Sequence, residues 1–229
     1  NFKVESKETS TSVETKIQDN SIQNNFIPGS VLKLKSNGEY RGVISCFAAF
    51  NQCEGWQKAV SRIIDCAIDY GGYFNKIDFY AEGAYVLILF GAPVAKENLN
   101  IRACEFALKI QDPALTSDIP NFRVKSGLTY ETVFAGFIGS KKRSEYSVLG
   151  MSVNLAARFM VHAKGHDVRI DRYLYKNTET YFESRFWHEH LFKGFSATIP
   201  VFRLFAKKKD SNKSIFQGKM VGRESESEE

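Results

Sequence analysis

Continuous apolar runs and helical spacings of apolar residues alternate along this chain. Apolar runs bounded by turn residues predict strands, and apolar side chains three or four residues apart predict amphipathic helices. We expect strands at 41–50, 73–80, 85–90, 123–129, 133–138 and 200–205, and helices at 56–70, 97–111 and 153–163. The second and third strands, and likewise the fourth and fifth, are spaced as hairpins. This order predicts an α/β fold, an α+β sandwich with a ferredoxin-like βαββαβ core.

The two ends of the chain differ in composition from the body between them. Residues 1–25 are rich in Ser, Thr, Asn, Gln, Glu and Lys, which is typical of a polar linker, and residues 207–229 become polar again. We therefore expect one folded domain over residues 26–206. Because the chain begins with Asn, we also expect it to be a fragment of a longer protein.

The overall composition is that of a folded, soluble protein. Of the 229 residues, 43% are hydrophobic and 25% are charged, and the formal net charge is +5. The basic clusters are too short to indicate a nucleic-acid partner. No apolar run approaches the about 18–20 residues of a membrane span, and the first residues lack the apolar core of a signal peptide. We expect a cytoplasmic protein.

The cysteines and histidines carry no strong metal signature. No two cysteines form a CxxC pair and no histidine stands at zinc-finger spacing, so we expect reduced thiols at Cys46, Cys53, Cys66 and Cys104. His188 and His190 alternate beside Trp187, and such a pair can bind a metal ion. Histidines at a strand end give the same pattern and are the commoner case.

Segment 136–160, GFIGSKKRSEYSVLGMSVNLAARFM, is the most informative part of the chain. It predicts a basic loop bounded by glycines, a short strand, a turn at Gly150 and a helix. Asn154 and Arg158 are four residues apart, so both project from one face of that helix. An amide and a guanidinium arranged in this way can orient a ribose and neutralise a phosphate. A solvated arginine and an asparagine near a helix start would show the same spacing.

These residues resemble the signature of the class III nucleotide cyclases, in which an R-x-EY-(T/D)-V-x-G segment leads into VNLAAR. This chain has RSEYSVLG at 143–150 and an unaltered VNLAAR at 153–158. LILFGAP at 87–93 resembles the family's third strand and turn, and Lys193 with the following glycine resembles its VKG element. The resemblance covers roughly residues 26–204 and implies the cyclase fold, with extra strands after the βαββαβ core.

The resemblance also implies how such a site works. Cyclase domains of this family pair, and the active site lies between the two domains. One face supplies two aspartates for two metal ions, usually magnesium. The partner face supplies base recognition and an Asn and an Arg that stabilise the phosphoryl group in transfer. The adenylyl cyclase reaction converts ATP to cyclic AMP and pyrophosphate.

The metal-binding half of that set is missing here. The first aspartate corresponds to Cys46, and the second, after the glycine of the central hairpin, corresponds to Ala84. Neither is a hard oxygen ligand, so this chain is not expected to bind the metal pair. Asp78 and Glu82 lie nearby and would substitute only after a shift in register.

The base-reading half is retained. Lys76 corresponds to the adenine-reading lysine, and Ser147 to the residue that accepts a hydrogen bond from the adenine amino group. Asn154 and Arg158 match the transition-state pair, and Lys193 matches a lysine that contacts the triphosphate. A lysine at the base-reading position favours ATP over GTP, although serine leaves the base preference less defined. Taken alone, either lysine could simply be solvated.

A domain that lacks the metal aspartates but keeps the base-reading residues resembles the second half of a tandem cyclase of the soluble adenylyl cyclase type. An aspartate-bearing domain, in the same longer polypeptide or a separate chain, would then hold Mg or Mn, and a homodimer of this chain should be inactive. The alternative is a catalytically inactive pseudo-cyclase that regulates an attached or partner signalling module.

Two further expectations come with the resemblance. The pseudo-symmetric pocket lined by Cys46 and Ala84 would accept a small regulator such as bicarbonate. MVGRE at 220–224 resembles the start of an ATPase module, and a random polar tail would look the same.

Overall fold

The computed structural model describes residues 38–209, except residue 82 and residues 141–142. The predicted linker at 1–25, the MVGRE segment and almost all of 207–229 lie outside the described residues. No helix within the described ranges is long and apolar enough to cross a membrane.

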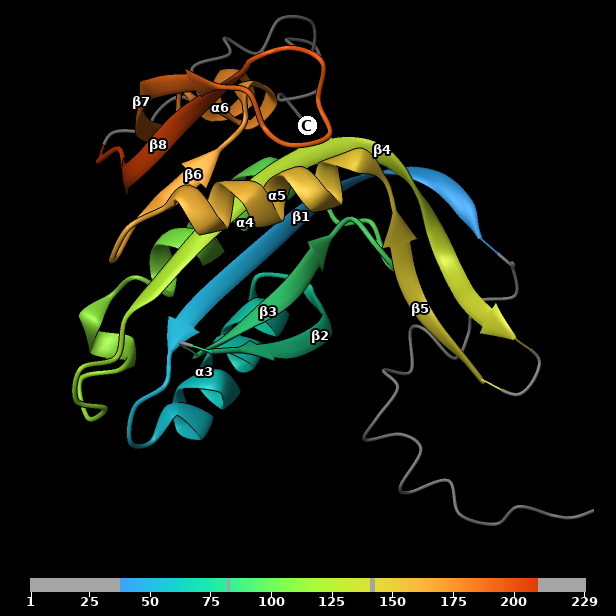
Figure 1. Cartoon of the computed structure of the whole chain (residues 1–229). Helices are drawn as coiled ribbons and strands as arrows, with labels where there is room; N and C mark the ends of the chain where they lie inside the picture. The colour runs from blue at the N-terminus through green and yellow to red at the C-terminus, as the bar shows by residue number, and fades with distance from the viewer. Residues whose placement is uncertain (1–37, 82, 141–142, 210–229) are drawn as a thin grey trace, which may run out of the picture. The chain divides into compact units, whose positions relative to one another are not determined.

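The described residues form an eight-stranded sheet with helices on both faces (Figure 1). The strands are β1 (Glu39–Asn51), β2 (Tyr73–Tyr80), β3 (Gly83–Phe90), β4 (Val124–Ser140), β5 (Arg143–Leu149), β6 (Val168–Ile170), β7 (Phe182–His190) and β8 (Ile199–Lys207). The helices are α3 (Trp56–Asp69), α4 (Leu99–Lys109), α5 (Met151–His162) and α6 (Arg172–Thr178), with a 3₁₀ turn at Pro113–Leu115. The strand order is β2-β3-β1-β4-β6-β8-β7, and β5 pairs with β4. The predicted βαββαβ core with extra C-terminal strands is therefore confirmed.

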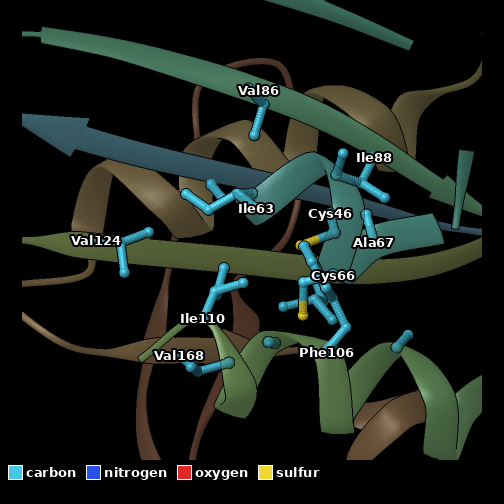
Figure 2. Close-up of a cluster of buried hydrophobic side chains, with 14 of the residues drawn as sticks. Cys46, Ile63, Cys66, Ala67, Val86, Ile88, Phe106, Ile110, Val124 and Val168 are labelled. Carbon is cyan, nitrogen blue, oxygen red and sulfur yellow. The ribbon is translucent and has the colours of Figure 1, made fainter. Parts of the chain in front are cut away.

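Strand β1 lies between β3 and β4 and is buried on both faces over most of its length. Ile44, Cys46 and Phe50 alternate toward the face of α3 and α4, where they join the main apolar cluster (Figure 2). Helix α5 crosses the opposite face, over β1 and β4 (Figure 1). A strand covered on both sides needs a continuous apolar run, which is why the sequence predicts β1 well.

Helix α5 rests directly on the backbone of β4 at Gly127. A Cβ at this position would lie 2.4 Å from the carbonyl oxygen of Ala156 and 2.3 Å from the backbone nitrogen of Met160. Only glycine leaves room for a helix to approach a strand this closely. Gly127 therefore determines how near α5, and every side chain on it, lies to the sheet.

One predicted feature is wrong: segments 123–129 and 133–138 do not form a hairpin. They are parts of the single strand β4, whose residues 124–135 pair without interruption with β1, and the hairpin joins β4 to β5. Residues 130–132, Tyr-Glu-Thr, interrupt the apolar pattern between the two segments, but tertiary contacts use them within the strand. Glu131, for example, accepts a hydrogen bond from the backbone N–H of Ser152 in α5 at 2.9 Å.

Replacing Gly127 with alanine should destabilise the domain by about 2–3 kcal/mol, because the added methyl group forces α5 away from β4. Gly165→Ala is the matched control: its Cβ would meet nothing within 4 Å, although its φ is +56°. That variant should lose only about 1 kcal/mol, the cost of a left-handed alanine. Urea unfolding compares the two variants, and equal losses would contradict the proposed role of Gly127.

Candidate functional site

Strands β2 and β5 meet at a polar corner formed by Asn75 and Ser147. The register of β2 against β3 shifts between Phe74 and Lys76, so Asn75 has no partner on β3. Its side chain contacts β5 instead, where the amide nitrogen donates to the carbonyl oxygen of Tyr146 at 2.8 Å. Lys76, the next residue, is exposed. The bulge thus brings Asn75 into contact with β5, although Tyr146 and Ser147 lie 71 and 72 residues further along the chain.

The amide of Asn75 has a defined orientation. Because its nitrogen is held by the carbonyl of Tyr146, its oxygen faces the hydroxyl of Ser147, 3.5 Å away. With the hydroxyl proton directed to Asn75, the oxygen of Ser147 keeps lone pairs that can accept a hydrogen bond. Sequence reasoning missed Asn75, because a bulge that turns one side chain to another strand leaves no mark in the hydrophobic pattern.

A single residue, Gly150, separates the end of β5 from the start of helix α5. Gly150 is extended and provides no side-chain cap. Glu131 of β4 takes that role through its hydrogen bond from Ser152, and a carboxylate at a helix N-terminus is favourable. The Thr129 hydroxyl also donates to the Ser152 carbonyl at 2.7 Å. Two contacts with β4 therefore hold the first turn of α5.

Asn154 and Arg158 lie one helical turn apart on α5, and both are exposed. Neither side chain forms a hydrogen bond or ion pair with another described residue. Lys193 is exposed in the turn between β7 and β8. The neighbouring Phe192 packs against Phe159 of α5 with ring centroids 5.5 Å apart. The structure therefore places the predicted site residues at one polar corner, along α5 and in a turn beside α5.

A comparison with protein-family models matches residues 64–199 to the adenylate and guanylate cyclase catalytic domain. The chain belongs to this family. Cyclase domains of the family act as dimers that bind nucleotides, and they use divalent metal ions.

Curated relatives agree with this membership. Adenylate cyclase type 10 of Rattus norvegicus is 34% identical over 111 residues, which are 48% of this chain and 7% of that protein. Adenylate cyclase 1 of Rhizobium meliloti is 31% identical over 83 residues, or 33% of this chain and 12% of that protein. The chain thus spans a small part of the length of these relatives.

Solved cyclase structures share the fold. The adenylyl cyclase CyaB from P. aeruginosa superposes with a TM-score of 0.66 at 17% identity, covering 76% of this chain and 99% of that one. The guanylate cyclase domain of RhGC from Catenaria anguillulae gives a TM-score of 0.63 at 21% identity, covering 74% and 98%. The likeness spans most of the described residues.

Cys46 and Ala84 do not face each other across the β1–β3 pair. Cys46 pairs with Ile88, whereas Ala84 pairs with Phe50, four residues further along β1. At ~3.4 Å per residue the two positions are about 13 Å apart along the strands. Cys46 instead lies in the apolar core beside Ile63 and Ile88 (Figure 2). Burial raises the pKa of its thiol well above the usual range.

Ala84 borders a small aromatic pocket at the end of the β1–β3 pair where β3 begins. The pocket has a volume of about 140 Å³ and is lined by Phe50, Gln52, Trp56, Phe79, Tyr80, Gly83 and Ala84. Cys46 is not part of its lining, contrary to expectation, and no lining residue carries a positive charge that would attract bicarbonate. The pocket fits a flat, apolar group better than a small anion.

Asp78 is the one of the two nearby acidic residues that the structure describes, and its carboxylate already has partners. Both carboxylate oxygens of Asp78 are engaged, one by its neighbour's backbone N–H at 2.9 Å and the other by the hydroxyl of Tyr85 at 3.0 Å. Glu82 falls at a position outside the described residues. The described residues at this edge therefore do not fit a metal pair.

Restoring aspartates at the two expected positions should not restore metal binding. The Cys46→Asp/Ala84→Asp double variant should show no stabilisation by Mn²⁺ in urea unfolding, because position 46 is fully buried among apolar side chains and does not line the pocket that Ala84 borders. Cys46→Asp alone should cost about 3 kcal/mol or more, since it buries a carboxylate among apolar side chains. Ala84→Asp, which can turn toward the pocket, is the comparison. A clear Mn²⁺-dependent gain in the double variant would show that an aspartate at position 46 can reach a metal ion from within the apolar cluster.

Proposed function

We propose that this chain is the non-metal half of an adenylyl cyclase, active only with an aspartate-bearing half. The observation that carries the proposal is an asymmetry between the two sides of the domain. The nucleotide-contacting set is complete, with exposed Lys76, Asn154, Arg158 and Lys193 and half-buried Ser147. In contrast, the positions where the family has its metal aspartates hold Cys46 and Ala84, in apolar and aromatic surroundings. The similarity to adenylate cyclase type 10 supports the same assignment.

The polar corner is suited to reading a base. Lys76 can donate to a ring nitrogen, which in adenine is an acceptor and in guanine carries a proton. Ser147, with its hydroxyl proton directed to Asn75, can accept from the amino group of adenine. Guanine has a carbonyl oxygen where adenine has the amino group, so two acceptors would face each other at Ser147. These two preferences favour ATP as the substrate.

The side chains around α5 are suited to the ribose and phosphates. Asn154 can orient the ribose, and Arg158 can donate to the phosphoryl group as negative charge develops on it. Lys193 can neutralise the outer phosphates. Mg or Mn, held by the partner half, would supply the activation of the ribose hydroxyl. No part of that metal site is assigned to this chain.

The β5–α5 junction also provides surface for a partner. Leu149 is 58% exposed and Met151 is 56% exposed, on either side of Gly150. They lie between Ser147 and Asn154 in sequence, so a domain that covers them would also reach the nucleotide-contacting residues. A homodimer would bring together two domains with the same apolar metal edge and is expected to be inactive.

Reconstitution tests the proposal directly. Cyclic AMP should form from ATP and Mg²⁺ or Mn²⁺ only when the chain is mixed with an aspartate-bearing cyclase half. In that mixture Arg158→Ala should lower kcat by about 10²–10³-fold, as expected for a lost transition-state donor. Arg172→Ala, which removes another exposed arginine from α6, should leave the rate unchanged.

Two results would count against the proposal. Activity of the chain alone would mean that it binds the metal ions itself. If the mixture formed no cyclic AMP although the two halves were shown to associate, the result would favour the regulatory pseudo-cyclase. Equal unfolding midpoints for Arg158→Ala and the parent chain show that any loss is not due to misfolding.

Base selectivity tests the polar corner. In the reconstituted enzyme, Ser147→Ala should lower the ratio of kcat/KM for ATP to that for GTP by about tenfold, the value of one hydrogen bond. Asn75→Ala should lower it by about two- to fivefold, because Ser147 stays but loses its fixed orientation. Asn177→Ala, on exposed α6, is the matched control. An unchanged ratio in both corner variants would remove Asn75 and Ser147 from base recognition.

A further inference from the structure

Three histidines from two elements converge at the end of α5. His162 is the last residue of α5, and His188 and His190 belong to β7. One ring nitrogen of each lies within 4.8 Å of those of the others, and all three residues are half-buried. The ring centroids of His162 and His190 are 4.5 Å apart, and those of His188 and His190 are 5.7 Å apart.

Packing between α5 and the last two strands produces this convergence. His188 pairs with Val201, and His190 pairs with Ile199. Both partners lie in the small apolar cluster that Phe159 of α5 shares with β8. The two strand histidines alternate on β7 and lie near α5. The sequence indicated only the pair on β7, because nothing in the chain pattern connects His162 to it.

The chemical state of the rings favours ligation. Burial, with the positive charges of His190 and Arg169 nearby, lowers the pKa of His188. Burial also lowers the pKa of His162, next to His190 and Arg158. The lowered pKa values of His162 and His188 favour the neutral imidazole at neutral pH, and this is the form that binds metal ions. The Nδ1 atom of His188 is buried and has no hydrogen-bond partner among the described residues.

We propose that His162, His188 and His190 bind a zinc ion. Three imidazole nitrogens are a common zinc donor set and leave a fourth position for water. A tetrahedral site with Zn–N bonds of about 2.0–2.1 Å places the nitrogens ~3.3 Å apart, so the rings must each move by about 1 Å. Small side-chain rotations of half-buried rings supply such a movement.

The surroundings select against hard cations. Among the described residues, no carboxylate belongs to the group, so its ligand atoms are imidazole nitrogens alone. Glu189, between the two strand histidines, accepts from the Thr198 hydroxyl at 3.1 Å. Mg²⁺ prefers oxygen ligands and would find none here, whereas imidazole suits zinc.

A metal ion here would connect α5 to β7. His162 lies four residues after Arg158 and eight after Asn154 on the same helix. Zinc would therefore fix the end of the helix that presents both residues. This inference does not depend on the proposed cyclase activity, since binding and stability measure it directly.

The test uses the folded chain with Cys53→Ser, so that the half-buried thiol does not compete for zinc. Calorimetric titration with Zn²⁺ should give one ion per chain, and a rise in the unfolding midpoint should accompany it. Each of His162→Ala, His188→Ala and His190→Ala should lower the affinity at least tenfold. His166→Ala, the exposed fourth histidine, should bind as the parent does.

Fluorescence gives a second readout that does not depend on stability. The ring of Trp187 lies 3.5 Å from that of His188, between centroids, and the chain has two tryptophans. In a Trp56→Phe background, Zn²⁺ should change the emission of Trp187, and Mg²⁺ should not. No zinc binding by the parent, or equal loss on His166→Ala, overturns the proposal, as would retained binding in all three cluster variants.

Discussion

The close approach of α5 to β4 is the constraint on which the rest of this domain depends. The helix backbone touches the strand at Gly127, where any side chain would collide with Ala156 and Met160. Its first turn is tied to the same strand through Glu131. With both points set, Asn154, Arg158 and His162 fall on consecutive turns at a defined height above the sheet. Asn154 and Arg158, which we propose contact the nucleotide, and the histidine cluster thus depend on the same helix.

The two sides of the domain differ in the chemistry they offer. At the β2–β5 corner, a bulge turns Asn75 toward Ser147 of β5, and the exposed Lys76 follows Asn75 on β2. At the β1–β3 edge, Phe50 lies opposite Ala84 and aromatic side chains surround a small pocket. Apolar and aromatic packing occupies the positions where the family has its metal aspartates, and this supports the proposal that the chain is the non-metal half of a cyclase.

The proposed zinc site and the proposed half-site act at opposite ends of α5. Asn154 lies near the start of the helix, which the β5–α5 junction holds, and His162 closes it. Because a helix is stiff over three turns, a restraint at its last residue also restrains the turn that carries Arg158. Metal binding and nucleotide contact would in this way be linked through one element, without a change in the sheet.

The sequence by itself determined the βαββαβ core and the family, because continuous apolar runs and the VNLAAR motif are local signals. It left β6, α6 and β7 unassigned, since β6 has three residues and β7 is largely polar. It also misread the polar centre of β4 as a turn. Only the tertiary structure decided the features that depend on register and long-range contact. These are the separation of Cys46 from Ala84, the turning of Asn75 to Ser147, and the meeting of His162 with β7. Each feature concerns residues that are distant in sequence. Their relative positions depend on how the strands pair and on how α5 packs against them, and the local sequence pattern does not show this.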